Sequence, residues 1–440
     1  MMRETATAIV RTLQDAGFAA FFVGGCVRDS LLGRAPGDFD IATNALPAAV
    51  EKLFPKTSAV GRKFGVMVVI ADGHQFQVAT FRAETDYQDG RRPEKISFGD
   101  APADALRRDF TVNGLFYDPV TEKIHDWVGG EGDLRTGVIR TIGVAEERFG
   151  EDHLRMLRAV RFAAQLGFEI EPLTFAAVQR LAPKIQAISA ERVRDELLKL
   201  FAPPHAARGL ELLHKSGLLA EVLPEIAATF SCEQSPDCHP EGSVFNHIRL
   251  MLEKLPADAS PALAWAVLLH DVAKPVTAEL DTVTGKIHFY GHEKIGADMA
   301  ETILTRLRFP NKQIEEIVTC VRYHMQFKDA PQMRKATLRR LLLRETFPLE
   351  LALHRLDCLG SHRRLEVYDF LEQQAEELKN QPAIRPPLLT GGDLIALGCP
   401  PGPAMGALLT ELRELQLGDE LQTPEAARVW VRQRLAVGRG

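Results

Sequence analysis

The first 130 residues alternate short apolar runs with turn signals, a pattern that predicts strands and a few short helices. Residues 18–23 are rich in aromatic and β-branched side chains and stop at two glycines, which indicates a buried strand leading into a tight turn. The β-rich runs 65–71 and 75–81 flank an Asp-Gly pair, a hairpin signal, and residues 47–53 have the pattern of a short helix. Together these elements predict a small mixed β-sheet.

A helical period replaces the strand pattern from about residue 141. In the stretch 151–161, apolar positions recur every three residues, and on a single helix Asp152, Arg155 and Arg158 would share one face. Beyond about residue 230 strand signals become rarer and helical apolar repeats dominate. The pattern therefore predicts an α+β protein with a sheet-containing front part and an all-α remainder.

Composition places the chain among ordinary soluble globular proteins. It has 440 residues, enough for about three domains, with 45% hydrophobic and 25% charged residues. The net charge of −6 means that any nucleic-acid binding must use local basic patches rather than a global field. No run approaches the roughly 20 apolar residues of a membrane span, and the six scattered cysteines suit a reducing compartment. We expect a cytoplasmic protein.

Chemistry concentrates first around residues 21–42. A strand, the pair Gly24-Gly25 and a following helix would form a phosphate cradle, with Arg28 adding a positive charge. Asp38 and Asp40 lie two residues apart on a second apolar segment, and on a strand they would point to the same face. Converging carboxylates usually hold a hard cation such as Mg²⁺, although the spacing alone also allows two acids on a solvated turn.

Two motifs now carry a resemblance. GGCVRD followed by DFDIATNA resembles the DNA polymerase beta type of nucleotidyltransferase head found in class II tRNA CCA-adding enzymes and bacterial poly(A) polymerases. RRDFTVNGL at residues 107–115 resembles the RRDFTxNAL motif of that family, with Gly114 where alanine is usual. The resemblance implies that Asp38, Asp40 and Asp109 hold two Mg²⁺ ions. It also implies attack of an RNA 3′-hydroxyl on the α-phosphate of a nucleoside triphosphate.

A third motif bears on the choice of nucleotide. Taken alone, residues 151–161 would suit an amphipathic helix with ion pairs on its surface. EDHLR at 151–155 nevertheless resembles the EDxxR motif of the family, which implies that Asp152 and Arg155 select C or A at the edges of the bases. In CCA-adding relatives a flexible loop, here residues 82–99, helps the switch from C to A. The resemblance implies this nucleotide-binding set: Gly24, Gly25, Arg28, Arg108, Asp152, Arg155, Arg158 and Arg161.

The second half carries a series of histidines and aspartates in the order H…HD…H…H…D, which resembles the HD phosphohydrolase superfamily. Imidazole with carboxylate suits a divalent transition metal, and water bound there becomes a nucleophile near neutral pH. The resemblance implies a phosphodiesterase or phosphatase that cleans RNA 3′ ends, and the alternative is an HD fold whose centre has decayed. The metal-site set is His247, His270, Asp271, His292, His324 and Asp357.

A basic amphipathic segment follows at residues 334–344. Its arginines and lysine would suit RNA phosphates or a solvated helix face equally well.

We therefore expect four regions, a catalytic head at 1–140, a helical neck and tRNA-binding body at 141–228, an HD domain at 229–380 and a helical tail at 381–440. The expected activity is template-independent addition of CCA to tRNA from CTP and ATP, with Mg²⁺ in the head and phosphohydrolase activity in the HD domain. An A-adding enzyme or a poly(A) polymerase is the near alternative, and an HD phosphohydrolase with an RNA-binding head is a more distant one. The expected protein is a monomer or a homodimer without membrane contact.

Overall fold

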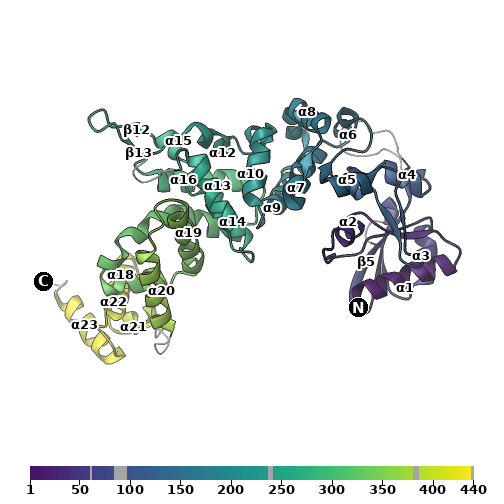
Figure 1. Ribbon diagram of the computed structural model, residues 1–440. Coiled ribbons are helices and arrows are strands. Elements are labelled where there is room, and N and C mark those ends of the chain that lie inside the picture. Colours follow the sequence, from purple (N-terminus) through teal and green to yellow (C-terminus); the bar gives the residue numbers. More distant parts are fainter. Residues whose placement is uncertain (60–61, 84–96, 236–240, 380–385, 438–440) are drawn as a thin grey trace. The chain divides into compact units, whose positions relative to one another are not determined.

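The computed structural model describes residues 1–59, 62–83, 97–235, 241–379 and 386–437. The chain forms two compact units, one of residues 1–227 with 306–308 and one of residues 228–305 with 309–440 (Figure 1). Most of the predicted loop at 82–99 lies outside the described residues. Among the described helices, none combines the length and the apolar character that a membrane crossing needs.

The first unit contains a seven-stranded mixed sheet. Only the β2–β5 pair is parallel among its neighbouring strands, and the other pairs are antiparallel. The strand order is β3 (Thr57–Ser58), β4 (Val66–Ala71), β5 (His74–Thr80), β2 (Ile41–Thr43), β1 (Ala20–Val23), β8 (Phe116–Asp118) and β9 (Lys123–His125). This confirms the predicted mixed sheet and its hairpin.

One strand prediction was wrong in its extent. Strand β2 begins at Ile41, so Asp38 and Asp40 precede the strand instead of lying on it. Ile41 and Ala42 are buried, whereas the stretch before them begins with exposed residues at Gly37 and Asp38. The ladder therefore starts where the apolar residues become continuous.

Helices and one short pair of strands complete this part of the first unit. Helix α1 buries Ile9, Val10 and Leu13, and α3 occupies the span predicted from the sequence. Strand β1 joins Val23 to a core that includes Phe81 and Phe116. The elements are α1 (Met2–Asp15), α2 (Gly25–Leu31), α3 (Pro47–Leu53), α4 (Ala101–Leu106), α5 (Gly130–Thr136), the 3₁₀ helices η1 (Arg62–Phe64) and η2 (Thr111–Asn113), and the pair β6 (Arg82–Ala83) and β7 (Ser97–Phe98).

The rest of the first unit is helical, apart from one parallel pair of short strands. Helix α7 packs against α9 and α10. The elements are α6 (Ala145–Glu151), α7 (Leu154–Leu166), α8 (Pro172–Leu181), η3 (Ala182–Ala187), α9 (Ala190–Leu200), α10 (Ala206–Lys215), α11 (Leu218–Val222), α12 (Pro224–Ala228), β10 (Val138–Ile139) and β11 (Glu169–Ile170).

The prediction of one helix over 151–161 was wrong. Helix α6 ends at Glu151, and Asp152 is extended with φ −148° and ψ 103° before α7 begins at Leu154. The Asp152 side chain accepts a hydrogen bond from the backbone N–H of Leu154. Such local bonding by aspartate competes with the helix and favours a break.

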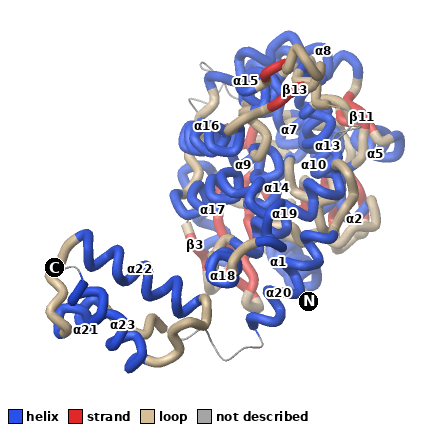
Figure 2. Tube along the Cα trace, turned by 90° about the vertical axis from the view of Figure 1, so that its left-hand side faces the viewer, coloured by secondary structure: helices blue, strands red, loops and turns tan. Residues whose placement is uncertain are grey.

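The second unit is almost entirely helical, as Figure 2 shows. Helix α14 is apolar on all sides and packs against α13, α17 and α19, and Ser243 and Ser260 cap α13 and α14. The elements are η4 (Thr229–Ser231), α13 (Val244–Glu253), α14 (Pro261–Leu269), α15 (Lys274–Thr277), β12 (Glu279–Leu280), β13 (Ile287–His288), α16 (His292–Arg306), α17 (Asn311–Tyr323), η5 (His324–Gln332), α18 (Lys335–Leu342), α19 (Phe347–Gly360), α20 (Glu366–Lys379), α21 (Gly391–Ala396), α22 (Pro403–Leu417) and α23 (Pro424–Val437).

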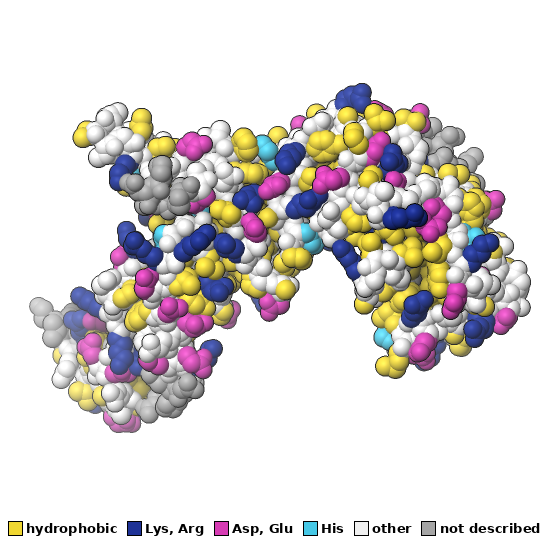
Figure 3. All heavy atoms as spheres, in the orientation of Figure 1, with side chains coloured by type: hydrophobic (Ala, Val, Ile, Leu, Met, Phe, Trp, Pro, Cys, Tyr) yellow, Lys and Arg dark blue, Asp and Glu magenta, His cyan; other side chains and the backbone are white. Residues whose placement is uncertain are grey.

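The basic segment at 334–344 pairs with carboxylates of this same unit. Lys335 and Arg339 each lie 2.6 Å from a carboxylate oxygen of Asp419, and Arg340 lies 2.6 Å from Glu414 on α22. The basic face is therefore largely neutralised within the chain, which favours neither of the two predicted roles. Over the face drawn in Figure 3, positive and negative side chains are likewise interspersed.

Two glycines of α5 provide a test of how this helix supports the head. A Cβ at Gly130 would lie 2.2 Å from the backbone oxygen of Thr111, whereas a Cβ at Gly132 would meet nothing within 4 Å. We expect Gly130→Ala to lower the free energy of unfolding by about 1–3 kcal/mol through overpacking. Gly132→Ala is the matched control and should raise it by about 0.5–1 kcal/mol, as for any exposed helical glycine.

Chemical denaturation followed by circular dichroism would measure both variants. Equal stabilities for the two alanine variants would contradict the close packing of α5 on η2.

Candidate active site

A cavity of about 550 Å³ opens in the first unit. It is lined by every residue that the sequence predicted for the head, together with four that it did not single out. The predicted residues are Gly24, Gly25, Arg28, Asp38, Asp40, Arg108, Asp109, Asp152, Arg155, Arg158 and Arg161, and the additional ones are Arg107, Asn113, Phe162 and Lys199. Residues from five separate stretches of the chain thus meet at one place.

Glycine is needed where the cavity approaches the backbone. Gly24 has φ +73°, and a Cβ there would lie 3.2 Å from the Nη1 atom of Arg108. Arg108 itself is held by Asp104, with Nη2 3.0 Å from the carboxylate, and lies over the ring of Phe116. The glycine therefore leaves room for a fixed guanidinium beside the turn.

Asp38 and Asp40 lie close enough to influence one another. Burial raises the pKa of Asp40, and the negative charge of Asp38 raises it further. A carboxylate whose ionisation is opposed by a neighbouring carboxylate forms a site that a divalent cation would stabilise.

Asp109 is buried and accepts four hydrogen bonds. Its Oδ2 accepts from Nε and Nη2 of Arg158 at 2.8 and 2.6 Å, and its Oδ1 accepts from Phe110 N at 2.9 Å and Asn113 Nδ2 at 3.2 Å. Although burial acts to raise it, the pKa of Asp109 is lowered by the Arg158 guanidinium. The carboxylate is therefore held ionised, as a metal ligand must be.

Asn113 joins two parts of the cavity that the sequence suggested separately. Its Oδ1 accepts a 2.7 Å hydrogen bond from Nη1 of Arg28, while its Nδ2 donates to Asp109. Its place in the RRDFTVN motif was the available signal for this role. Phe162 has no such signal, yet the guanidinium carbons of Arg28, Arg158 and Arg161 lie 5.2, 5.2 and 4.0 Å from its ring centre.

The two residues predicted to select the base already have partners. Asp152 Oδ2 accepts from Arg192 Nη2 at 2.7 Å. Arg155 Nη1 donates to Glu151 at 2.5 Å and to the backbone oxygen of Arg148 at 2.9 Å. They line the same cavity without sharing the face of one helix, because α6 ends before Asp152.

The remaining predicted arginine, Arg161, is buried against α9. Its Nε lies 2.6 Å from Glu196 Oε2, and Arg158 Nη1 lies 3.6 Å from the other oxygen of that carboxylate. Glu196 thus compensates two of the arginines that line the cavity.

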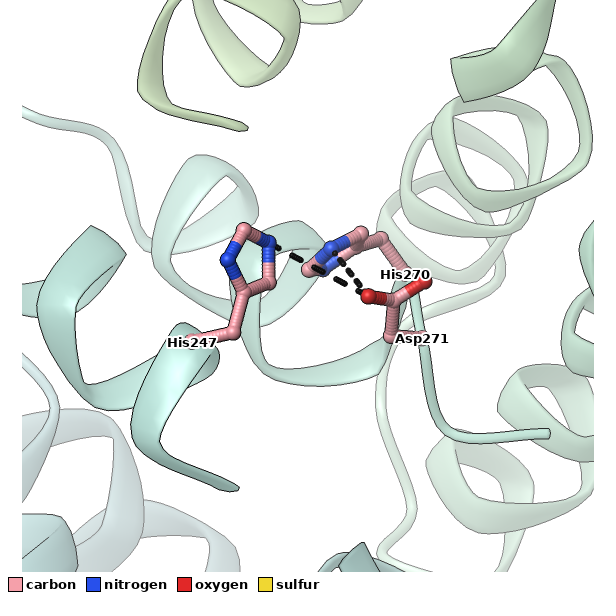
Figure 4. Close-up of side chains that lie close together, drawn as sticks. All are labelled: His247, His270 and Asp271. Carbon is pink, nitrogen blue, oxygen red and sulfur yellow. Dashed lines mark ion pairs between the residues drawn. The ribbon is translucent and has the colours of Figure 1, made fainter. Parts of the chain in front are cut away.

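The second unit brings the predicted metal ligands together in its core. His247 lies on α13, His270 and Asp271 follow α14, and His292 begins α16; His324 follows α17. All five are buried, with exposed fractions of 0, 1, 2, 6 and 5%. Figure 4 shows the imidazoles of His247 and His270 beside the Asp271 carboxylate. Two groups of potential ligands result, one of His247, His270 and Asp271 and one of Asp271, His292 and His324.

Asp271 presents one oxygen to each pair of histidines. Its Oδ2 lies 3.1 Å from His270 Nε2 and 4.0 Å from His247 Nε2, and its Oδ1 lies 3.4 Å from His292 Nε2 and 3.9 Å from His324 Nε2. The sixth predicted ligand also reaches the cluster, since Asp357 Oδ1 lies 3.1 Å from His247 Nε2.

The opposite ring nitrogens of the histidines point away from Asp271. The Nδ1 atoms of His270, His292 and His324 lie 2.9, 2.7 and 2.7 Å from backbone oxygens three residues earlier. His247 differs, because its Nδ1 lies 2.8 Å from Oε1 of Glu241. Each ring therefore presents Nε2 to the cluster.

The surroundings shift the pKa values of several residues of the cluster. Burial, followed by the charge of His270, lowers the pKa of His324 to about 3, so its imidazole is neutral. Although burial opposes it, the charges of His270 and Lys274 hold the pKa of Asp271 well below its usual value. An ionised carboxylate and a neutral imidazole are donors that divalent transition metals prefer. Although burial acts to lower it, hydrogen bonds to Asp357 and Glu241 raise the pKa of His247 to about 9, so this ring would lose a proton on binding a metal. Lys274, 2.7 Å from Asp271 Oδ2, was not predicted.

Three protein families match successive parts of the chain. Residues 20–140 match the family described as "Poly A polymerase head domain", residues 167–230 match "Probable RNA and SrmB- binding site of polymerase A", and residues 242–359 match "HD domain". Each match lies within one part of the chain, and together they include most of the residues discussed above.

Named relatives give a consistent result. The CCA-adding enzyme of Geobacillus kaustophilus (strain HTA426) is 48% identical over 226 residues, which are 51% of this chain and 55% of that enzyme. The chain thus spans about half the length of this curated relative. The CCA-adding enzyme of Latilactobacillus sakei is 38% identical over 282 residues, which are 62% of this chain and 70% of that enzyme.

A solved structure extends the likeness over nearly the whole chain. The Bacillus stearothermophilus CCA-adding enzyme, solved in complex with CTP, has a TM-score of 0.75 and 29% identity, covering 99% of this chain and 98% of that one. Together with the match that includes 70% of the Latilactobacillus sakei enzyme, this fold shows that the chain belongs to the family of CCA-adding enzymes.

Proposed function

We propose that the chain adds C, C and A to the 3′ ends of tRNA, using CTP and ATP in the head cavity. The observation that carries this proposal is that three groups of residues line one cavity: the three carboxylates predicted to bind Mg²⁺, the EDxxR residues Asp152 and Arg155 predicted to select the base, and four further arginines predicted to bind nucleotide. The CTP complex of the Bacillus stearothermophilus relative supports CTP as a substrate. An A-adding enzyme or a poly(A) polymerase remains the near alternative, because the same head motifs serve all three.

Asp38, Asp40 and Asp109 would hold Mg²⁺ in this proposal. When bound, Mg²⁺ stabilises the attacking and leaving oxygens of the displacement. Arg158 keeps Asp109 ionised through its two hydrogen bonds, and Arg28 and Arg108 offer guanidinium forks to the triphosphate. The head would then orient the reacting phosphate and compensate its charge.

Asp152 and Arg155 would read the Watson–Crick edge of the incoming nucleotide. A carboxylate accepts from the exocyclic amine of C or A, and a guanidinium donates to the ring acceptor beside it. G and U present the opposite order of groups. Arg192 and Glu151, which already contact these two side chains, would hold them in place.

We further propose the four regions expected from the sequence, with head, neck and body in the first unit and the HD domain and tail in the second. The HD cluster would act as a metal-dependent phosphodiesterase or phosphatase on damaged RNA 3′ ends. Its six ligands would hold a divalent transition metal, which supplies a nucleophilic water near neutral pH. The described cysteines are free, in keeping with a reducing compartment such as the cytoplasm.

Three tRNA transcripts, ending at the discriminator base, after C and after CC, would test the head. We expect addition that stops at CCA on all three with CTP, ATP and Mg²⁺, as sequencing of the product ends would reveal. Asp38→Asn should reduce the rate at least about a hundredfold, because metal stabilisation contributes several kcal/mol. The exposed Asp15 gives the matched control, Asp15→Asn, which should leave the rate unchanged.

Other products would identify the alternatives. One A on the CC-ended transcript alone would mean an A-adding enzyme, and long A tails would mean a poly(A) polymerase. No addition by the unmodified protein would favour an HD phosphohydrolase with an RNA-binding head.

Base selection gives a second prediction. We expect Asp152→Ala and Arg155→Ala to lower the preference for CTP and ATP over GTP and UTP by about tenfold or more, since a bidentate base contact contributes about 1–3 kcal/mol. Single-nucleotide addition kinetics with each triphosphate would measure this. The exposed ion pair of Arg180 provides the control Arg180→Ala. Equal losses of the addition rate for all four nucleotides would contradict the assignment of base selection to Asp152 and Arg155.

The HD cluster gives a third prediction. We expect the protein to hydrolyse a 2′,3′-cyclic phosphate after loading with Ni²⁺, Co²⁺ or Mn²⁺, and to lose this activity with a chelator. Asp271→Asn should abolish hydrolysis, because Asp271 belongs to both ligand groups, while CCA addition persists. His362→Ala, at an exposed histidine, is the control. An unmodified protein inactive with every metal would mean a decayed centre.

A further inference from the structure

We propose that Glu241 is a positioning residue for the HD metal cluster. Its carboxylate holds His247 in the tautomer that presents Nε2 to a divalent metal, and it strengthens that nitrogen as a donor. This inference rests on the proposed metal-binding role of the cluster, and it concerns a residue outside the predicted ligand set.

The contact that carries the proposal is buried and short. Glu241 Oε1 lies 2.8 Å from His247 Nδ1, and the two side chains are 4% and 0% exposed. On the other side of the ring, Nε2 lies 3.1 Å from Asp357 Oδ1 and 4.0 Å from Asp271 Oδ2. The imidazole thus lies between Glu241, on its Nδ1 side, and the predicted ligands Asp357 and Asp271, on its Nε2 side.

The surroundings fix both the ring and the carboxylate. A Cβ at Gly360 would lie 3.4 Å from His247 Cε1 and 3.5 Å from Nδ1, so the backbone of α19 closes one flank of the ring. Glu241 precedes the cap residue Ser243, which accepts from Asn246 N at 3.3 Å, and Asn246 Nδ2 donates to the Glu241 backbone oxygen at 3.4 Å. The start of α13 therefore ties Glu241 to the helix that carries His247.

A comparison within the cluster shows why Glu241 matters. His270, His292 and His324 each place Nδ1 against a backbone oxygen, a neutral acceptor that no substitution removes. At His247 the acceptor is a carboxylate. A charged acceptor forms the stronger hydrogen bond and raises the basicity of the opposite nitrogen. Of these four histidines, His247 is thus the one whose donor strength depends on a replaceable side chain.

Metal affinity, measured without any substrate, tests this role. We expect Glu241→Ala to weaken Co²⁺ binding by about 10–100-fold, the usual effect of removing such a partner. Glu241→Gln keeps an acceptor oxygen but not the charge, so it should weaken binding by less than Glu241→Ala does. Glu253 is an exposed residue of α13, the helix that carries His247, and Glu253→Ala is the matched control with unchanged affinity.

Competition with a chromophoric chelator would give the affinities, and the visible absorption of bound Co²⁺ would report the ligand field. A shifted Co²⁺ spectrum in Glu241→Gln, with metal-free melting like that of the unmodified protein, supports positioning over a purely structural role. If Glu241→Ala does not fold, the Gln variant decides by the same two measurements.

Two negative results have different meanings. Co²⁺ binding by the unmodified protein with the same affinity and spectrum in the Glu241→Gln and Glu241→Ala variants would overturn the role of Glu241 alone. No Co²⁺ binding by the unmodified protein would overturn the proposed metal function of the cluster, and this inference with it.

Discussion

Both candidate sites depend on one constraint: buried charged side chains need partners of opposite charge. In the first unit, Asp109 is held by Arg158 at 2.6 Å, and Glu196 reaches both Arg161 and Arg158. In the second unit, Lys274 lies 2.7 Å from Asp271, which also faces four imidazoles. A charge taken out of water without such a partner costs several kcal/mol, so the chain can gather ionised groups only where opposite charges are gathered too.

This constraint explains the elements that surround the head cavity. Helix α7 supplies Arg158 and Arg161, and the packing of α9 against it brings Glu196 within reach of both. The break after α6 leaves Asp152 at a helix end, where Arg192 of α9 lies 2.7 Å from its carboxylate. Helix α9 thus supports Asp109, a proposed metal ligand, indirectly through Arg158, and it supports Asp152, the carboxylate proposed to read the base, directly.

Local patterns in the sequence predicted many of the elements and site residues. They could not predict which residues pair over long distances along the chain. The strands at β1, β4 and β5, helix α3 and eleven of the fifteen residues that line the head cavity followed from periodicity, turn signals and the motifs that carry the resemblance. The start of β2 and the break at Asp152 could not be predicted in this way. An aspartate just before a strand, or between two helices, fits the periodic pattern of the neighbouring element, so the sequence does not mark the boundary. The partner of the basic segment lies about 80 residues away, at Asp419, and no periodicity reveals it.

Donor chemistry then separates the two proposed metal sites. The head offers carboxylate oxygens among arginines, a set that suits a small hard cation that keeps part of its water and binds phosphate oxygens. The HD cluster offers four imidazole nitrogens and two carboxylates, which favour first-row transition metals over Mg²⁺. Each His in that cluster directs Nε2 inward because Nδ1 is already bonded elsewhere. Hydrogen bonds outside each proposed ligand set thus fix which atoms a metal would meet at each of the two sites.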